Sequence, residues 1–279
     1  MEALLKDQLG YLNLTGRVSK TEKHPCGGGG FGDVWRGRCD GTEVAIKVPR
    51  IYETRMADRE SAMNKVAKRL RREAMVWRQL DHPNVLRFLG VCYNNIPPVH
   101  DFPALLSPLC ENGNILDYLR IHQDVERLPL LVQITAGLGY LHENLVIHGD
   151  LKGSNVLIKD NGDACISDFG CSRLIGDQPL HSSTTVMSVR WSAPELVFAE
   201  PDVSGGGYLL TSAADVWSFA MVVLEVFNHG KVPWFEIRND MGVAMEIVTG
   251  ATPNRNQYPM VPGPIWTILL CCWEQDSNN

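Results

Sequence analysis

The stretch VIHGDLKGSN, residues 146–155, places a carboxylate, a lysine and an amide within six consecutive residues. Asp150 is placed to accept a proton from a hydroxyl group, and the amide oxygen of Asn155 is a hard ligand suited to Mg²⁺. Gly149 stands between His148 and Asp150, where it contributes no side chain. The stretch therefore raises the question of whether this loop performs chemistry or has lost a residue that the chemistry needs.

Two further charged positions extend this set. Asp168, in SDFGCS, supplies a second oxygen ligand for Mg²⁺, and Lys47, in VAIK, is flanked by residues that favour a strand. A lysine buried on a sheet needs a counter-charge, and Glu73 in RLRREAMVW is the best candidate. Taken alone, Glu73 would more often be a solvent-exposed partner of Arg69 or Lys68.

The stretch CGGGGFGDVW, residues 26–35, fits the pattern G-x-G-x-x-G through Gly27, Gly29 and Gly32. Glycines allow backbone N–H groups to approach phosphate oxygens without a Cβ in the way. A dinucleotide-binding fold would require this loop to open a helix, whereas the residues that follow alternate as in a strand. The pattern therefore argues against a dinucleotide enzyme, but by itself it is equally compatible with a glycine-rich turn in a hairpin.

The hydrophobic pattern changes along the chain and predicts an α+β fold. The first part contains a hairpin, a polar helix and two more strands, predicted at residues 33–39 with 42–49, 56–80, 85–93 and 103–109. The second part contains helices and two short strands, predicted at residues 115–122, 128–145, 155–158, 163–168 and 211–227. The last of these helices is apolar nearly all round, as expected of a helix inside a domain.

These motifs occur in the order and approximate spacing of the protein-kinase signature set, which also includes Ala193-Pro194-Glu195. The match extends from about residue 20 to residue 279. The stretches VRWSAPE, ADVWSFAMVVLEVF and KVPWF resemble the tyrosine-kinase-like group of serine/threonine kinases. The resemblance implies a two-lobed protein-kinase fold, with a small β-rich N-lobe, a larger α-helical C-lobe and ATP in the cleft.

The resemblance also implies a division of the chain. The parts are an N-terminal leader at 1–15, the N-lobe at 16–107, a hinge at 108–113 and the C-lobe at 114–279. We expect the C-lobe to be truncated at its end, because the family pattern continues into a helix whose arginine pairs with Glu195. Glu195 would then be buried without its partner, and breaking such a pair typically costs about 3–5 kcal/mol.

The catalytic roles that the resemblance implies fall on charged residues. Lys47 would hold the α- and β-phosphates of ATP and pair with Glu73. Asp150 would be the catalytic base, and Lys152 would lie near the γ-phosphate. Asp215, in ADVWSF, would brace the backbone of the catalytic loop from a buried helix.

ATP and Mg²⁺ are the cofactors that the resemblance implies. Asn155 and Asp168 would hold the metal. The remaining ATP-binding residues would be Gly27, Gly29 and Gly32 at the phosphates, Cys26, Val34, Ala45 and Leu157 around the adenine, and Ser107, Pro108 and Cys110 at the hinge. Ser107 would be the gatekeeper, and the Pro108 carbonyl and the Cys110 N–H would face the adenine, which a proline allows.

The acceptor is predicted to be serine or threonine on protein substrates. Lys152, two residues after Asp150, is the serine/threonine form of the loop. Ser188, seven residues before Glu195, matches the hydroxyl that such kinases place near the base. The stretch RWSAPE points weakly towards tyrosine instead.

Gly149 is the main departure from the family, which usually has His-Arg-Asp. The arginine pairs with a phosphate on the activation loop and couples that loop to the base, which glycine cannot do. The loop still offers Ser182, Ser183, Thr184 and Thr185 as phosphorylation sites. We therefore predict activity that does not require activation-loop phosphorylation, and the competing interpretation is drift in an inactive copy. In a second departure, Cys26 replaces a branched apolar residue, which predicts weaker adenine packing.

An alternative of a different class is a pseudokinase that acts as a nucleotide-binding scaffold. A decayed kinase usually loses at least one of five residues, and all are present here: Lys47, Glu73, Asp150, Asn155 and Asp168. Their presence favours an active enzyme.

The composition, with 44% hydrophobic and 21% charged residues, is that of a soluble globular protein. A net charge of -6 argues against nucleic acid as the main partner, and the basic stretch KVAKRLRRE suits a solvated helix face. The absence of a signal peptide, of an apolar run of about 18 residues and of CxxC pairs predicts a cytoplasmic, intracellular protein with free thiols and no membrane span. Cys271 and Cys272 are expected in the core, and the sequence does not predict the oligomeric state.

Overall fold

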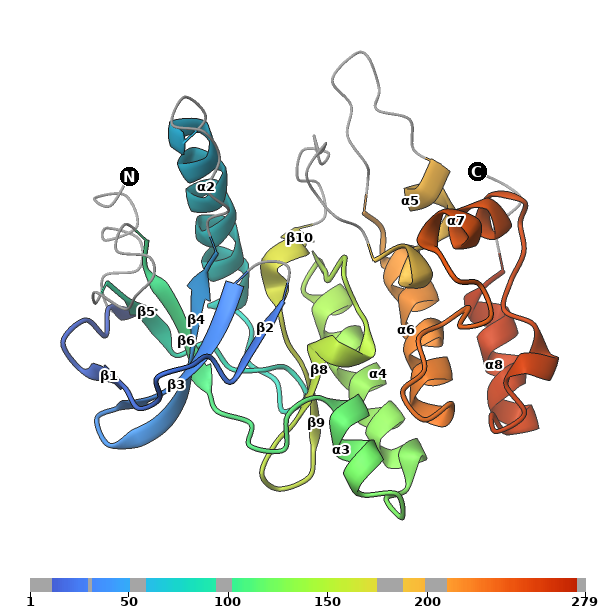
Figure 1. Ribbon diagram of the computed structural model, residues 1–279, viewed down its shortest axis with the longest axis horizontal. Coiled ribbons are helices and arrows are strands. Elements are labelled where there is room, and N and C mark those ends of the chain that lie inside the picture. The colour runs from blue at the N-terminus through green and yellow to red at the C-terminus, as the bar shows by residue number, and fades with distance from the viewer. Residues whose placement is uncertain are drawn as a thin grey trace. The chain divides into compact units, whose positions relative to one another are not determined.

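The structure, a computed structural model, describes residues 12–29, 32–50, 59–93, 102–174, 188–198 and 210–274. It divides the chain into two compact units: unit 1 is Met1–Glu111 with Asp168–Gly170, and unit 2 is Asn112–Ser167 with Cys171–Asn279 (Figure 1). The division thus falls between Glu111 and Asn112, inside the segment 108–113 that the sequence predicts as a hinge. The predicted α+β class, with a β-rich first part and a helical second part, is confirmed.

Unit 1 is built around an antiparallel sheet with the strand order β1-β3-β4-β6-β5, to which β2 is added beside β3. Its strands are β1 (Val18–Lys20), β2 (Gly27–Gly29), β3 (Gly32–Cys39), β4 (Thr42–Pro49), β5 (Gly90–Cys92) and β6 (Ala104–Pro108). The predicted hairpin is confirmed, with Cys39 paired to Thr42. Asp40 and Gly41 between them both have positive φ, as a tight two-residue hairpin turn requires.

The helix α2 (Arg59–Trp77) confirms the predicted polar helix, whose first residues, 56–58, lie outside the described part. Four of its buried residues recur at helical spacing, Ala67, Leu70, Ala74 and Trp77, and Glu73 and Val76 are buried as well. Trp77 contacts the rings of Phe88 and Phe169 at centroid distances of 5.2 Å and 5.6 Å. The helix therefore packs through one apolar stripe and leaves its basic face in solvent.

Unit 2 is mainly helical. Its helices are α3 (Ile115–Ile121), α4 (Arg127–Glu143), α5 (Pro194–Phe198), α6 (Ser212–Phe227), α7 (Asp240–Val248) and α8 (Gly263–Cys272). Two short antiparallel pairs join β8 (Val156–Ile158) to β9 (Ala164–Ile166), and β7 (Val146–Ile147) to β10 (Arg173–Leu174). Single 3₁₀ turns cover Gly153–Asn155, Val189–Trp191 and Arg255–Gln257, and a fourth, Phe169–Cys171, begins in unit 1 and ends in unit 2.

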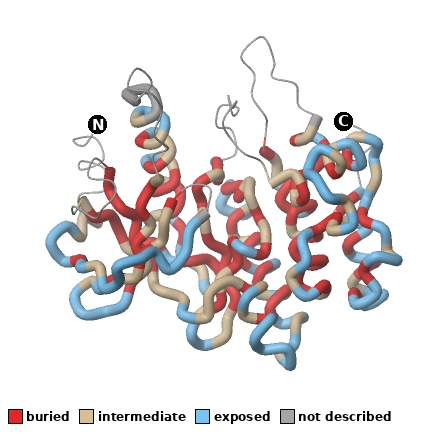
Figure 2. Tube along the Cα trace, in the orientation of Figure 1, coloured by how far each residue is buried: buried red, intermediate tan, exposed pale blue. Residues whose placement is uncertain are grey.

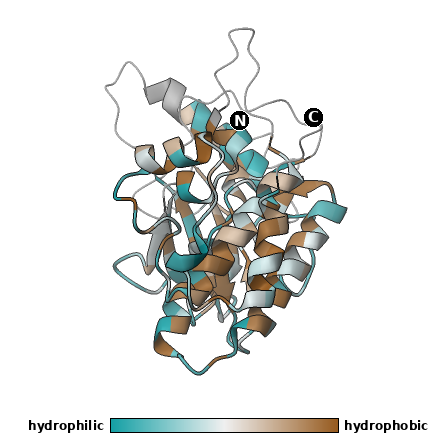
Figure 3. Ribbon diagram, turned by 90° about the vertical axis from the view of Figure 1, so that its right-hand side faces the viewer, coloured by the Kyte–Doolittle hydropathy of each residue, from teal (hydrophilic) through white to brown (hydrophobic). Residues whose placement is uncertain are grey.

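The centre of unit 2 is α6, which begins where the Thr211 hydroxyl caps the backbone N–H of Ala214. All seven residues from 220 to 226 are buried, so the helix is covered on every side, as its sequence predicts. Buried residues, red in Figure 2, gather in the strands of unit 1 and in the helices of unit 2. Figure 3 shows hydrophobic and hydrophilic residues sharing the same helices.

Two local predictions are wrong. Only Gly90–Cys92 of the strand expected at 85–93 is a strand: Val85, Leu86 and Phe88 are buried, but pairing to β6 begins at the Leu89 N–H. Cys271 is exposed and Cys272 is half-buried on α8, because Trp266, Leu269 and Trp273 form its buried face. Among the described helices, none has the length and apolar character of a membrane span.

Candidate active site

Unit 1 brings three of the predicted charged residues together around Lys47. The Lys47 ammonium lies 2.7 Å from Glu73 Oε1 and 2.5 Å from Asp168 Oδ1. Burial alone would lower the pKa of Lys47, but the attraction of Asp168 and Glu73 outweighs burial and raises that pKa, so Lys47 is a cation at neutral pH. Glu73 is only 2% exposed, which excludes its alternative role as a solvent-exposed partner of the basic helix face.

Asp168 is held in an unusual backbone conformation. Its φ is 62°, in the left-handed region, and such conformations cost about 1–3 kcal/mol and persist only where the surroundings hold them. The Gly170 N–H lies 3.4 Å from Asp168 Oδ1, and Phe169 is completely buried against Trp77 of α2. The segment Asp168–Gly170 is thus fixed to unit 1 by charge and by packing.

The sheet of unit 1 presents several of the predicted ATP-binding residues on one face. Val34 lies opposite Lys47 across β3 and β4, and Ala45 lies opposite Ser107 of β6. Because paired residues of an antiparallel sheet, and residues two apart on one strand, point to the same side, all four share a face. Ser107 is buried, and its hydroxyl donates to the Pro108 carbonyl over 3.3 Å.

The other predicted ATP-binding residues flank this face or belong to unit 2. Cys26 is exposed, and both its N–H (2.9 Å) and its thiol (3.3 Å) donate to the Val34 carbonyl, which sets the start of β2. Gly27 and Gly29 lie in β2 and Gly32 opens β3, so a strand and not a helix follows the glycine-rich stretch, as the sequence predicts. Cys110 follows β6 in unit 1, whereas Leu157 lies in β8 of unit 2.

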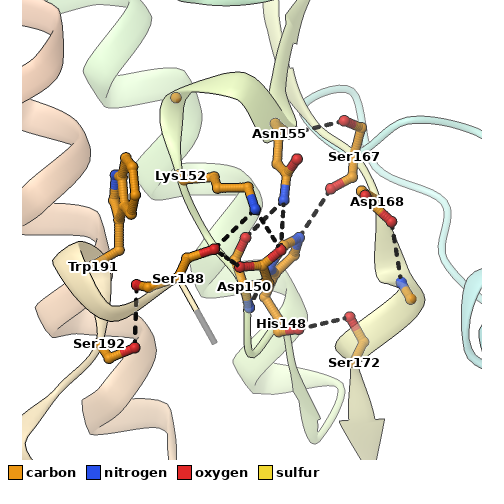
Figure 4. Close-up of polar contacts among 12 residues, drawn as sticks. His148, Asp150, Lys152, Asn155, Ser167, Asp168, Ser172, Ser188, Trp191 and Ser192 are labelled. Carbon is orange, nitrogen blue, oxygen red and sulfur yellow. Dashed lines mark hydrogen bonds and ion pairs between the residues drawn. The ribbon is translucent and has the colours of Figure 1, made fainter. Parts of the chain in front are cut away.

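Unit 2 gathers Asp150, Lys152 and Ser188 into a closed triangle of hydrogen bonds (Figure 4). Lys152 Nζ donates to Asp150 Oδ2 and to Ser188 Oγ, each over 2.9 Å. The Ser188 hydroxyl donates to Asp150 Oδ1 over 2.8 Å. Asp150 therefore already accepts a hydrogen bond from a hydroxyl group beside a cation, which is the geometry that a base needs to take a proton from an alcohol.

Asn155 is buried next to this triangle. Its Nδ2 donates to the Asp150 carbonyl over 2.7 Å, which fixes the amide plane. In the described part of the chain its Oδ1 receives no hydrogen bond, so a hard oxygen remains available to a cation. The carboxylate of Asp168 offers the same kind of atom, so both predicted metal ligands fit Mg²⁺ in their chemistry.

Asp215, buried in the first turn of α6, holds the backbone of the catalytic loop as the resemblance implies. Its Oδ2 accepts from the His148 N–H (2.8 Å), and its Oδ1 accepts from the Gly149 N–H (2.9 Å). The ring of His142 lies 2.9 Å from the same Oδ2. On its other side the loop is held by the His148 ring, which lies 2.9 Å from the Ser167 carbonyl (Figure 4).

Gly149 adopts a left-handed conformation with φ 77°. A Cβ at this position would lie 2.7 Å from Leu210 Cδ1 and 3.2 Å from the Cys171 carbonyl, and real Cβ contacts are essentially never under 3.0 Å. A side chain here would therefore force Leu210 to move. The position where the family has arginine is therefore crowded by Leu210 and strained by its φ.

Glu225 also supports the catalytic loop and was not identified from the sequence. Its Oε2 accepts from the Gly153 N–H and from the Trp191 indole N–H, each over 2.8 Å. Burial raises the pKa of Glu225 to about 7 although both hydrogen bonds oppose the shift. The signal was available, because an acidic residue in an otherwise apolar helix needs donors that a buried loop can supply.

The expectation for Glu195 is wrong. Glu195 is exposed in the first turn of α5, and the Thr211 hydroxyl lies 3.5 Å from its Oε1. A carboxylate near a helix N-terminus is favourable in solvent, so the penalty for a broken buried pair does not apply. The predicted phosphorylation sites Ser182, Ser183, Thr184 and Thr185 lie outside the described residues.

Comparison with known proteins gives one family and a consistent group of relatives. The family model described as protein tyrosine and serine/threonine kinase matches residues 21–279. Over 264 residues the chain is 30% identical to ephrin type-A receptor 5 of Rattus norvegicus, covering 91% of this chain and 24% of that protein. It is 30% identical over 266 residues to ephrin type-B receptor 4 of Mus musculus, and this match covers 90% of this chain and 24% of that protein. The chain thus spans about a quarter of the length of these relatives.

Proposed function

The chain belongs to the protein tyrosine and serine/threonine kinase family, and from that premise we propose that it transfers the γ-phosphate of ATP to serine and threonine hydroxyls of proteins. The carrying observation is the triangle of Asp150, Lys152 and Ser188. Asp150 would accept the proton of the acceptor hydroxyl, and Lys152 would offset negative charge on the transferred group. The family description covers both kinds of acceptor, so the choice of serine or threonine rests on Lys152 and Ser188.

The nucleotide would be held by unit 1 and by the loop residues already described. Lys47, oriented by Glu73, would bind the α- and β-phosphates, and the shared face of Val34, Ala45 and Ser107 would pack on the adenine. Asn155 and Asp168 would hold Mg²⁺, which when bound neutralises charge on the phosphate oxygens. The other site residues would position the nucleotide and the acceptor hydroxyl, and such positioning accounts for most of the catalysis of phosphoryl transfer.

The test is a phosphorylation assay with purified protein, Mg-ATP and paired peptides that differ only in a serine or a tyrosine acceptor. Wild type should phosphorylate the serine peptide, and Asp150→Asn should lose at least about a hundredfold of that rate because the base is removed. Equal rates for the two proteins would refute catalysis and favour the alternative, a nucleotide-binding pseudokinase. A preference for the tyrosine peptide would refute only the choice of acceptor.

We also propose that activity does not require phosphorylation of the activation loop. Gly149 has no side chain to pair with a phosphate, and a Cβ at this position would lie 2.7 Å from Leu210 Cδ1. The quadruple replacement of Ser182, Ser183, Thr184 and Thr185 by alanine should leave turnover within a few-fold of wild type. A loss of about a hundredfold would show that the loop is still switched by phosphate.

We further propose that the protein works in a reducing intracellular environment and that its partners are its protein substrates. All eight cysteines lie in the described residues and all are free thiols, which supports this setting.

A further inference from the structure

Arg69 of α2 reaches the segment that carries Asp168. It lies one helical turn before Glu73, and its Nε donates to the Gly170 carbonyl over 3.3 Å. The two residues are 101 positions apart in the sequence, but both belong to unit 1. The contact therefore ties α2 directly to the end of the Asp168–Gly170 segment.

Three charged groups converge on Gly170. A Cβ at this glycine would lie 2.6 Å from Arg69 Nη2, 3.2 Å from Asp168 Oδ1 and 3.3 Å from Glu73 Oε2. The guanidinium and the two carboxylates are thus packed around one backbone carbon. A side chain at this position would displace the guanidinium, which lies nearest.

Arg69 brings a second cation to this cluster. Lys47 contacts the carboxylates of both Glu73 and Asp168, so one cation faces two anions. Arg69 adds a second cation beside the same two anions. In a partly buried cluster an uncompensated charge is costly, and a guanidinium keeps its charge at any relevant pH.

The segment Asp168–Gly170 also needs contacts with other residues to keep its conformation. Asp168 has the left-handed φ of 62°, a conformation that requires support from its surroundings. Lys47 holds the Asp168 side chain at one end of the segment, and Arg69 holds the Gly170 carbonyl at the other. Groups of unit 1 thus hold both ends of the segment that carries the Asp168 carboxylate.

We propose that Arg69 is a positioning residue that fixes Gly170 and thereby orients the Asp168 carboxylate for Mg²⁺ and ATP. The proposal deepens the proposed function and rests on it for the metal. The Arg69 contact also links α2 to Gly170 without a phosphate. This matters in a chain that has Gly149 in place of the arginine that would bind a phosphate of the activation loop.

The experiment compares Arg69→Met, which keeps the aliphatic stem, with Arg69→Lys, which keeps the charge. Lys68→Met is the matched control, because Lys68 is the exposed neighbour on the same helix. Hydrogen exchange is measured at the amides of residues 168–170, and Mg²⁺ is titrated into protein with ATP while the melting temperature is followed. The phosphorylation rate is measured on the same samples.

Arg69→Met should exchange about tenfold faster at residues 168–170 and need about tenfold more Mg²⁺ for half-maximal stabilisation, since a charged hydrogen bond is lost. Arg69→Lys should recover part of both effects, and Lys68→Met should match wild type. The proposal is overturned if Arg69→Met matches Lys68→Met, or if its exchange rises equally throughout the unit 1 sheet, which would indicate a general structural role. Failure of the wild type to transfer phosphate would refute the proposed function, whereas the exchange comparison would still decide the role of Arg69.

Discussion

At the scale of a residue, Gly149 shows how a missing side chain can be a requirement of the fold. Its left-handed φ of 77° would strain any other residue, and a Cβ here would lie 2.7 Å from Leu210 Cδ1, so that this side chain would have to shift. Its N–H is also one of the two that Asp215 holds, so the backbone cannot relax without breaking that bond. Restoring the arginine of the family should therefore damage this loop instead of repairing it.

We accordingly predict that Gly149→Arg lowers the melting temperature by about 5 °C and lowers turnover, because left-handed strain of about 1–3 kcal/mol is added beside Asp150. The double variant Gly149→Arg with Leu210→Ala should recover part of the loss, since the two positions share one space. Differential scanning calorimetry on wild type, the two single variants and the double variant measures this coupling. A Gly149→Arg protein that melts like wild type would show that Leu210 does not close the position.

At the scale of an element, α4 contains a glycine that, unlike Gly149, has room for a side chain. Gly139 is exposed within the helix, and a Cβ there would meet nothing within 4 Å. Glycine in a helix interior is less favourable than alanine by about 0.5–1 kcal/mol. We therefore expect Gly139→Ala to raise the melting temperature by about 1–3 °C without changing the phosphorylation rate.

Gly137, buried in the same helix, provides the comparison for this prediction. Alanine at 137 has the same backbone advantage, but its methyl group is added at a buried position, where overpacking is destabilising. Thermal melts should therefore give Gly137→Ala a lower melting temperature than Gly139→Ala. Equal values for the two variants would mean that packing around α4 is looser than its burial indicates.

Elements were predictable where a local pattern decides them. The β3–β4 hairpin follows from alternation around Asp40 and Gly41, and α6 follows from a long apolar run after a capping Thr211. Residues 85–89 were mispredicted because an apolar run is buried equally well in extended loop or strand, and only the partner strand decides between them. Cys271 was mispredicted because the composition of α8 does not reveal which of its faces is covered.

At the scale of the whole molecule, the charged site residues were predictable because their types and order carry the chemistry. Lys47 and Glu73 do meet, and Asp150 does lie beside Lys152 and Ser188. Contacts made across long sequence separations were not predictable from any local pattern. The hydrogen bond from Arg69 to Gly170 and the packing of Leu210 on Gly149 exist only once the chain has folded.

Glu225 gives a property of the whole molecule, the dependence of its stability on pH. Burial raises the pKa of Glu225 from 4.5 to about 7, so between these values the folded protein keeps a proton that the unfolded chain has released. Stability therefore falls as pH rises from about 4.5 to about 7, and the contribution lost is about 3 kcal/mol. The effect ends above pH 7, where both states are ionised.

Glu225→Gln should remove this dependence, because an amide oxygen can still accept from the Gly153 N–H and the Trp191 indole while carrying no charge. Thermal melts from pH 5 to pH 8 should show the variant melting several degrees above wild type at pH 8 and close to it at pH 5. Glu246→Gln, which changes an exposed side chain on α7, serves as the control and should follow wild type throughout. A Glu225→Gln protein that is less stable than wild type at pH 8 would mean that the buried carboxylate is a net stabiliser when ionised, with its two donors outweighing its burial.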